Sequence, residues 1–197
     1  IRRICKIHSG YRQLGMLEKI LQSKRSQIEE LAKIHSIANF EEEAVHFKHR
    51  NFSDKLIKSE QSQQIGVIAE VKKASPSKGI LRKNFEAKNI ARLYENNSAS
   101  CISVLTDEKF FKGSIENLIL ARRETSIPVL RKDFIIDPLQ VAESYALHAD
   151  CILLIAAALP SSLLVELESQ ALSYGMDCLL EVHDEADLEK VMSCKSK

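Results

Sequence analysis

The 197-residue chain has almost no net charge, because 28 lysines and arginines offset 27 acids and leave +1. Surfaces that bind nucleic acid or anionic membranes normally carry a basic excess, so the composition supports neither partner. The longest strongly apolar run, from Cys151 to Leu159, is far shorter than the ~20 residues that cross a bilayer. The composition is therefore that of a globular protein with no membrane or nucleic-acid partner.

The five cysteines are scattered, with no CxxC pair and no even-numbered framework. Cys101, Cys151 and Cys178 each begin an apolar run, which is typical of small buried hydrophobes. A chain that uses cysteine in this way belongs in a reducing compartment. We therefore expect a cytoplasmic protein.

Glycine-rich phosphate-binding motifs and metal-ligand clusters are missing too. No GxGxxG follows the first apolar run and no GxxxxGK[ST] exists, since Lys78-Gly79 has the reverse order; both common nucleotide-binding motifs are thereby excluded. His46 and His49 lie three residues apart in the segment Phe40–Ile57, but no third ligand has convincing spacing. We interpret them as part of a solvated helix face, and we expect no metal and no cofactor.

Residues 1–15 begin with Ile, are basic and lack acids. A transit peptide has this character, but a translated upstream region explains it better, because a clean helical pattern opens at Met16. We interpret residues 1–15 as a non-native or disordered extension. From Met16 to about Ile37 apolar residues recur with a period near 3.6, which predicts an amphipathic helix. Residues 16–64 are expected to form an N-terminal helical extension.

Residues 65–197 alternate short apolar runs with helical patterns. The runs are expected to be strands at Ile65–Val71, Cys101–Leu105, Ile127–Leu130, Cys151–Ala156 and Cys178–Val182. The helical patterns cover Glu86–Asn96, Ser114–Arg123, Pro138–His148, Leu163–Tyr174 and Glu185–Ser193. Runs that are apolar throughout are typical of a parallel sheet covered on its faces. Repeated βα units predict an α/β fold, either an open doubly wound sheet or a (β/α)8 barrel.

Charged residues gather where three of these strands end. Glu70 and Lys72 close the first strand, Lys132 follows the third, and Glu181 ends the fifth. In both candidate folds the carboxyl ends of the strands meet at one edge, where chemistry is done. Carboxylates interleaved with lysines hold each other charged and can move protons. The pattern predicts a proton-transferring enzyme.

Aromatic residues follow two of the strands. Phe110 and Phe111 lie after the second strand and are followed by Gly113 and Ser114, a glycine and a helix-capping residue. Phe134 comes just after Lys132. These rings form either a hydrophobic plug between loop and sheet or an aromatic wall for a planar substrate. The residues alone leave both alternatives open.

Taken together, these segments resemble the indole-3-glycerol-phosphate synthase family of tryptophan biosynthesis. The segments are Glu70-Val71-Lys72-Lys73-Ala74-Ser75-Pro76-Ser77-Lys78-Gly79, Leu105-Thr106-Asp107-Glu108-Lys109-Phe110-Phe111-Lys112-Gly113-Ser114, Leu130-Arg131-Lys132-Asp133-Phe134, Leu154-Ile155-Ala156 with Leu159, and Leu180-Glu181-Val182-His183. They match in type, order and spacing from about Met16 to the end of the chain. The resemblance implies a (β/α)8 TIM barrel with an N-terminal helical extension.

The resemblance also implies a reaction and its residues. The substrate would be 1-(2-carboxyphenylamino)-1-deoxyribulose 5-phosphate, which closes its ring and loses carbon dioxide and water without a cofactor. Lys132 would be the general acid, with Glu181 moving protons in dehydration and Glu70 orienting the lysines and the substrate amine. Lys72 would pair with the substrate carboxylate or act as a further acid. The aromatic and loop residues implied to bind the substrate are Ser75, Phe111 and Phe134.

The chain departs from the family in length. A barrel of this kind has eight strands and about 250 residues, whereas about five βα units are recognisable here. The strands implied to grip the substrate phosphate are among those not seen, so we expect the chain alone to be weakly active or inactive. The alternatives are another cofactor-free sugar-phosphate barrel, either an isomerase or a Schiff-base aldolase, and a non-catalytic fragment. Either a monomer or a fusion to another enzyme of the pathway is compatible with the sequence.

Overall fold

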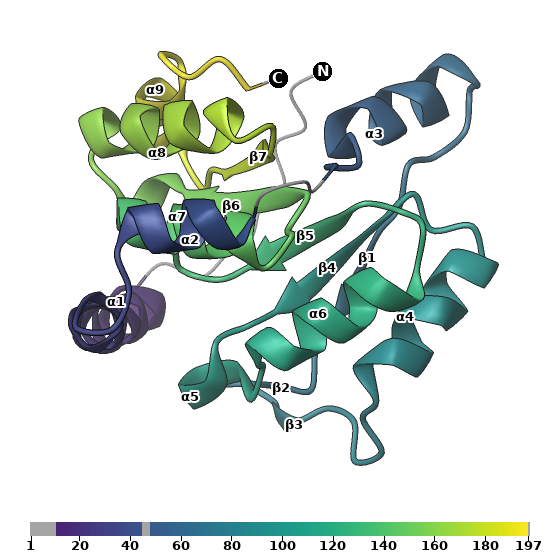
Figure 1. The fold of residues 1–197 in the computed structure, drawn as a ribbon, viewed down its shortest axis with the longest axis horizontal. Coiled ribbons are helices and arrows are strands. Elements are labelled where there is room, and N and C mark those ends of the chain that lie inside the picture. The colour runs from purple at the N-terminus through teal and green to yellow at the C-terminus, as the bar shows by residue number, and fades with distance from the viewer. Residues whose placement is uncertain (1–10, 45–47, 197) are drawn as a thin grey trace.

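The computed structural model describes residues 11–44 and 48–196, with the side chains of 11–14 excepted. Within these residues five parallel strands form one sheet, in the order β1-β4-β5-β6-β7 (Figure 1). The strands span Ile68–Val71 (β1), Cys101–Leu105 (β4), Val129–Lys132 (β5), Cys151–Ile155 (β6) and Asp177–Glu181 (β7). Each coincides with a predicted strand to within a few residues, as expected for strongly apolar runs.

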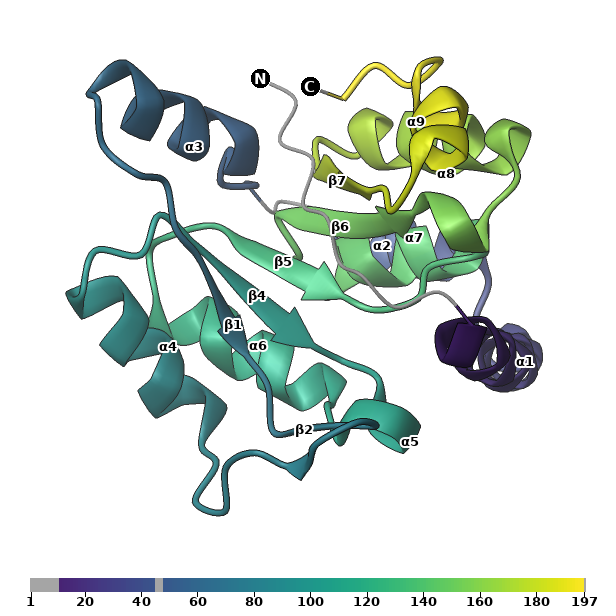
Figure 2. The ribbon, with the colours of Figure 1, turned by 180° about the vertical axis from the view of Figure 1, so that it is seen from behind.

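The order of the strands decides between the two candidate folds. Each new strand is added beside the previous one, whereas a doubly wound sheet reverses direction at a switch point. The connecting helices also cover one face only, since α4 and α6 lie in front of the sheet in Figure 1 and behind it in Figure 2. Successive addition with helices on one face is the arrangement of a TIM barrel. The prediction of a partial barrel is thereby confirmed.

The outer face of the sheet packs against the helices that connect the strands. These are α4 (Ala87–Asn96), α6 (Ile115–Glu124), α7 (Pro138–Ala146) and α8 (Ser161–Ser173), with α9 (Glu185–Val191) after the last strand. Side chains that alternate along the strands, such as Val104, Ile152 and Leu154, pack against Leu118 of α6 and Leu167 of α8. Burying such side chains contributes about 1.5–3 kcal/mol each, so this layer is the main source of stability.

The inner face carries a second, smaller apolar cluster. Cys101, Leu130, Cys151 and Leu153 meet there, and helix α3 (Phe52–Gln61) closes their amino ends with Phe52. Asp177, the first residue of β7, holds the first turn of α3. Its Oδ2 accepts from the backbone N–H groups of Phe52 and Ser53 at 2.7 and 3.0 Å. Two unpaired N–H groups of the helix are satisfied in this way.

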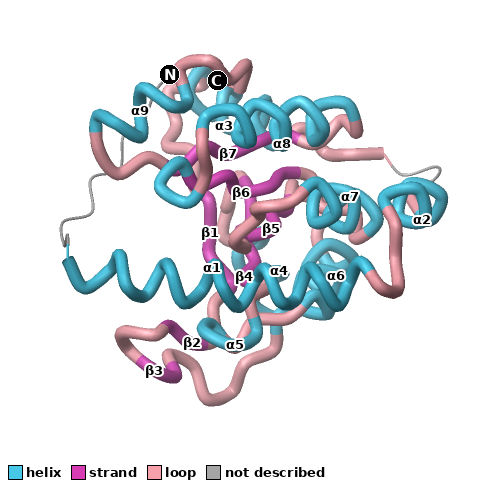
Figure 3. Tube along the Cα trace, turned by 90° about the vertical axis from the view of Figure 1, so that its left-hand side faces the viewer, coloured by secondary structure: helices cyan, strands magenta, loops and turns pink. Residues whose placement is uncertain are grey.

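The N-terminal helices lie outside the sheet. Helix α1 (Tyr11–Ala32) crosses in front of the carboxyl ends of the strands in Figure 3. Helix α2 (Ile37–Glu43) packs on α7 through Phe40, Leu139 and Ala142. The predicted amphipathic helix is therefore present, but it begins at Tyr11 rather than Met16. The predicted non-native extension falls largely on residues 1–10, which lie outside the described residues.

Two local expectations differ from the structure. His49 does not lie on a solvated helix face, because it precedes α3 and its half-buried ring stacks on Tyr145 with 5.5 Å between centroids. Burial lowers the pKa of His49 despite the opposing field of Asp150. His46 lies outside the described residues. The segment after β1 is not a simple loop either, since Ala74–Ser75 (β2) and Gly79–Ile80 (β3) pair as a short antiparallel hairpin.

No helix in the described ranges, 11–44 and 48–196, is long and apolar enough to cross a bilayer.

Candidate functional site

One carboxylate and two ammonium groups meet at the carboxyl ends of β1 and β5. The Nζ of Lys132 lies 2.9 Å from Oε2 of Glu70, and the Nζ of Lys72 contacts the other oxygen, Oε1. Each side chain retains about a third of its exposed surface, between 28% and 35%. A substrate can therefore reach the cluster. Three of the four predicted charged residues are brought together here.

The sheet register explains why these side chains share one face. Glu70 is paired with Ser103 on β4, and Lys132 is paired with Leu105 two residues further along the same strand. Paired residues of parallel strands point to the same side, and so do residues two apart. Glu70 and Lys132 therefore both point inward, above the apolar cluster of the inner face. Lys72, two residues after Glu70, points the same way.

The two lysines keep Glu70 ionised. Partial burial alone would favour the neutral carboxyl, but hydrogen bonds from Lys72 and Lys132 outweigh it and hold the pKa of Glu70 below its ordinary value. The two ammonium groups thus meet through a shared anion. Such a site has one anionic centre between two proton donors, which is suited to binding and protonating a substrate oxygen.

Glu181 points to the same face but stands apart from the three. Its Oε1 lies 3.3 Å from Nε2 of His183. The other ring nitrogen of His183 faces Asp187 at 3.8 Å, and Asp187 is buried and paired with Lys190 at 3.3 Å. Sequence reasoning placed Glu181 correctly at the rim but did not assign His183, although it follows Glu181 by only two residues.

The two predicted aromatic residues face each other across adjacent loops. Phe111 ends the short helix α5 (Glu108–Phe111), and its ring centroid lies 6.1 Å from that of Phe134. The segment 112–113 returns tightly toward β4, because Lys112 is left-handed with φ 50° and a Cβ on Gly113 would overlap the carbonyl of Leu105. Both rings are only partly buried. Phe134 also packs against the apolar cluster of the inner face.

Ser75 lies in the hairpin beside this loop. Its Oγ accepts from the backbone N–H of Lys78 at 3.3 Å, which closes the Ser75–Lys78 turn. Strand β2 of the hairpin contacts α5. Ser75 therefore sits next to the aromatic loop, with the tip of the hairpin exposed to solvent.

Two features of the site were missed in the sequence. Ser103 is buried at 5% exposure on the inner face, beside Glu70, and its hydroxyl has no hydrogen-bond partner in the part of the chain that the structure describes. Arg131 and Asp133, on either side of Lys132 in the chain, are both buried. Arg131 points to the outer face and pairs with Glu143 of α7 at 2.7 Å. Alternation along the strand separates these two from Lys132.

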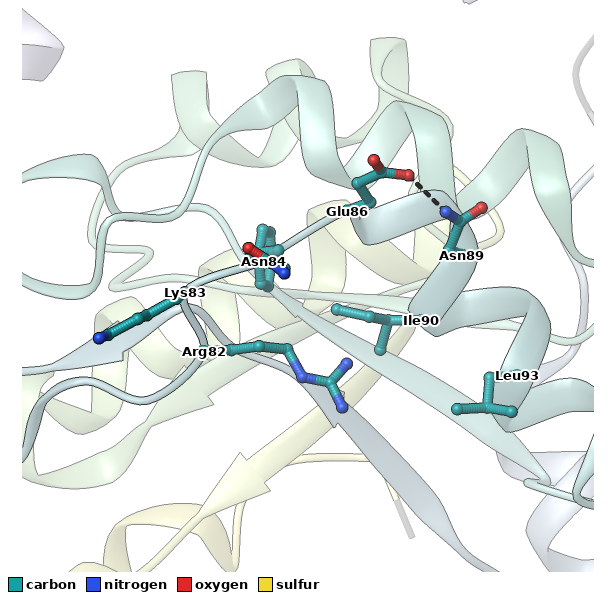
Figure 4. Close-up of a pocket in the computed structure, with 8 residues that line it drawn as sticks. Arg82, Lys83, Asn84, Glu86, Asn89, Ile90 and Leu93 are labelled. Atoms are coloured by element: carbon teal, nitrogen blue, oxygen red, sulfur yellow. Dashed lines mark hydrogen bonds between the residues drawn. The ribbon is translucent and has the colours of Figure 1, made fainter.

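A cavity of about 580 Å³ lies elsewhere, between the segment before α4 and that helix (Figure 4). Its walls include Arg82, Asn84 and Leu93, and Asn89 donates a hydrogen bond to Glu86 at its rim. None of the predicted site residues lines it. Most of the residues that line it are exposed.

Across residues 11–44 and 48–196, no group of three or more His, Cys, Asp or Glu side chains is arranged to hold a metal ion. The cysteines with described surroundings, Cys101, Cys151, Cys178 and Cys194, are all free. Burial raises the pKa of Cys101 to about 12, so its thiol stays protonated and inert.

Comparison with known proteins identifies a family. The family model described as indole-3-glycerol phosphate synthase matches residues 17–197. A protein of Acinetobacter baumannii named indole-3-glycerol phosphate synthase is 45% identical over 181 residues. Proteins with the same name from Acinetobacter baylyi and Burkholderia vietnamiensis are 44% and 45% identical over 181 residues.

The match covers nearly all of this chain but less of its relatives. It includes 91% of the chain and 66% of the Acinetobacter baumannii protein, and 92% and 69% for the Burkholderia vietnamiensis protein. The chain thus spans about two thirds of the length of these relatives. The match begins inside α1 and runs through all five strands, so it includes the whole Glu70 cluster. This chain belongs to the indole-3-glycerol phosphate synthase family.

Proposed function

We propose that this chain supplies the acid–base part of an indole-3-glycerol phosphate synthase site, a carbon–carbon lyase that acts on 1-(2-carboxyphenylamino)-1-deoxyribulose 5-phosphate in the cytoplasm. The observation that carries the proposal is the Glu70 carboxylate held between Lys72 and Lys132 at the open end of the barrel. The relatives' names supply the reaction class. The chain supplies residues of the types that this reaction needs.

The first step forms a carbon–carbon bond and needs an acid. The ring carbon that carries the carboxylate attacks the ketone carbon, and the ketone oxygen takes up a proton as its double bond opens. Lys132 is the donor, because its ammonium group is part-exposed and already fixed in position by Glu70. Carbon dioxide then leaves and its bonding electrons restore the aromatic ring. The enzyme contributes orientation and a proton, with no cofactor.

The second step removes water. The hydroxyl formed in the first step leaves with a proton from an acid, and a base removes a proton from the ring system to complete the indole. Glu181 is the base, held at the rim by His183. Lys72 either pairs with the substrate carboxylate before it is lost or donates the proton to the leaving hydroxyl. Both roles use the same ammonium group beside Glu70.

The planar part of the substrate needs an apolar surface. Phe111 and Phe134 offer two rings tilted by 36° to each other, and Phe134 packs against the apolar cluster of the inner face. Flat aromatic groups bind such ring pairs through offset or edge contacts, which contribute about 0.5–1.5 kcal/mol beyond burial. Ser75 and its hairpin cover the pocket from the side of α5. The phosphate-binding residues belong to the part of the barrel that the match does not cover, which is about a third of each relative.

The test is turnover, followed by the fluorescence of the indole product. It is run on the chain and on a chimera completed with the unmatched remainder of the Acinetobacter baumannii relative. We expect Lys132→Met to lower kcat of the chimera at least ~1,000-fold, and Lys132→Arg to restore little. Lys88→Met, an exposed lysine of α4, is the matched control and keeps full activity.

The same chimera separates the alternatives. A Schiff-base aldolase would give a covalent adduct on Lys132 after borohydride reduction with substrate, whereas an acid catalyst gives none. A non-catalytic protein would lose nothing when Lys132 is replaced. A chimera that folds but shows no turnover before any substitution would count against the proposed reaction.

A further inference from the structure

A lysine of α1 is buried beside the site without being part of it. Lys24 is only 4% exposed. Its Nζ lies 2.9 Å from Oδ2 of Asp107 and 2.7 Å from Oδ1 of Asp133. Removing an ammonium group from water costs several kcal/mol unless it is well paired. Two buried carboxylates meet that condition, and they come from different loops.

Both carboxylates also organise their own loops. Asp107 begins α5, and its Oδ1 accepts from the backbone N–H of Phe110 at 2.7 Å. Asp133 accepts from the backbone N–H of Phe134 at 2.8 Å and from the hydroxyl of Thr106 at 2.6 Å. Asp107 therefore shapes its loop with Oδ1 and binds Lys24 with Oδ2. Asp133 uses Oδ1 for both the Phe134 N–H and Lys24, while its Oδ2 accepts from Thr106.

These loops carry the proposed substrate-binding rings. Phe111 follows the residue held by Asp107, and Phe134 is itself held by Asp133. Lys132 directly precedes Asp133 in the chain. The position of Lys24 thus sets where two loops lie relative to each other, and with them the 6.1 Å separation of the two rings.

The charge balance shows which loop depends on Lys24 more. Asp133 has a second cation nearby, Arg131 at 3.6 Å, which is itself paired with Glu143. Asp107 is fully buried, and Lys24 is its ion-pair partner. Without the ammonium group, the buried carboxylate of Asp107 would lose this partner, and a buried ion that loses its partner is strongly destabilising. The loop that carries Phe111 is therefore the more sensitive one.

We propose that Lys24 is a positioning residue that fastens the loops after β4 and β5 to α1, so that the N-terminal helix sets the geometry of the aromatic pocket. The proposal rests on the proposed function only in assuming that Phe111 and Phe134 bind the substrate. The fastening itself is a property of the fold and can be measured without substrate.

The experiment is amide hydrogen exchange followed by NMR on the full chain. In Lys24→Met we expect the amides of Phe110 and Phe134 to exchange at least ~10-fold faster, because their acceptors lose the cation that fixes them. The amide of Leu154 in the core of the sheet is expected to change less than ~2-fold. Lys24→Arg should restore part of the protection. Lys33→Met, directly after the end of α1, is the matched control, because its ion pair with Glu30 is exposed.

Two results would overturn the proposal. One is unchanged exchange at Phe110 and Phe134 in Lys24→Met. The other is an equal acceleration at Leu154, which would mean that Lys24 contributes only to global stability. If Lys24→Met does not fold, the double variant Lys24→Met/Asp107→Asn removes the unpaired charge, and faster exchange at Phe134 is the expected result there.

Steady-state kinetics of the chimera test whether Lys24 also affects substrate binding and turnover. A positioning role predicts that Lys24→Met raises KM and lowers kcat/KM by about 10–100-fold, while the pH at which the rate is greatest does not move. A shifted pH profile would instead mean that Lys24 takes part in proton transfer. If the chimera makes no indole product at all, the proposed reaction fails while the exchange result still decides the role of Lys24.

Discussion

Glu70 of β1 and Lys132 of β5 are joined by a 2.9 Å ion pair that passes over the intervening strand β4. The pair spans two strand spacings and an offset of two residues in the sheet register, which the two long side chains bridge. Lys72 occupies the other oxygen of the carboxylate. One anion therefore fixes two cations from different strands.

The first prediction concerns this shared carboxylate. Glu70→Gln keeps the shape but removes the charge that holds Lys72 and Lys132, so both ammonium groups lose their fixed positions. We expect kcat/KM of the chimera to fall about 100-fold, and the free energy of unfolding to change little, since the cluster is part-exposed. Steady-state kinetics and urea unfolding measure the two. Glu116→Gln on the exposed side of α6 is the control; equal losses in both variants would contradict the prediction.

The second prediction concerns the unpaired hydroxyl of Ser103. A buried hydroxyl without a partner is costly, so Ser103→Ala should leave the free energy of unfolding unchanged or raise it by up to ~1 kcal/mol. Ser144 is a matched control, because its buried hydroxyl donates to Gln140 and accepts from Arg131. Ser144→Ala should lower the free energy of unfolding by about 1–2 kcal/mol. Urea unfolding of the chain tests both variants.

Ser103 also tests the extent of the site. If its hydroxyl contacts the substrate beside Glu70, Ser103→Ala will raise KM of the chimera although the protein is no less stable. A destabilised Ser103→Ala variant would show that the hydroxyl has a partner in the folded protein, and the prediction would then be wrong.

The third prediction is a loss of stability in acid. The pKa of Glu70 is lowered by its lysines, and that of Asp133 is lowered because Arg131 and Lys24 outweigh its burial. A carboxyl with a lowered pKa when folded binds fewer protons than when unfolded, so its contribution is complete above the unfolded pKa. That contribution is lost as the pH falls below the ordinary pKa, which is 4.5 for Glu70 and 3.8 for Asp133, and then through the lower pKa of the folded protein.

Urea midpoints at pH 7, 5, 4 and 3.5 measure this loss. Because other carboxylates also titrate in that range, the useful quantity is the difference between variants. Asp133→Asn should have a lower urea midpoint than the parent at pH 7, and the difference between the two midpoints should narrow as the pH falls. A gap that is constant with pH would contradict the lowered pKa of Asp133.

The strands and the residues at their carboxyl ends could be predicted from the sequence, because each pattern had a single structural explanation. Runs such as Cys151–Ile155 are apolar throughout because β6 is buried on both faces, so the strands could be predicted. The rim position of Glu70 and Lys132 followed from the rule that the ends of parallel strands meet. The barrel itself was not decided by periodicity, since both candidate folds alternate strand and helix; the order of the strands decided it.

Other features depend on contacts between distant residues, which a pattern does not reveal. Lys24 lies among charged residues of an amphipathic helix and reads as solvated, yet it is buried because its partners arrive from two later loops. Arg131 reads as one of three charges at a strand end, and only the packing of α7 shows where it points. The ring of His49 is placed by Tyr145, far along the chain.

The last prediction concerns His183, which lies between Glu181 and Asp187 at 3.3 and 3.8 Å. Its ring holds the proposed base at the rim, while Asp187 is itself fixed by Lys190. His183→Leu removes the ring that contacts Glu181, and should lower kcat of the chimera about 10-fold with a smaller effect on KM. His183→Asn can still hydrogen-bond, so its kcat should fall less. The side-chain ¹⁵N shifts of His183 in the chain itself should change in Glu181→Gln but not in the exposed control Glu185→Gln. Shifts that ignore Glu181 would show that the contact is incidental, and the base would then need another means of orientation.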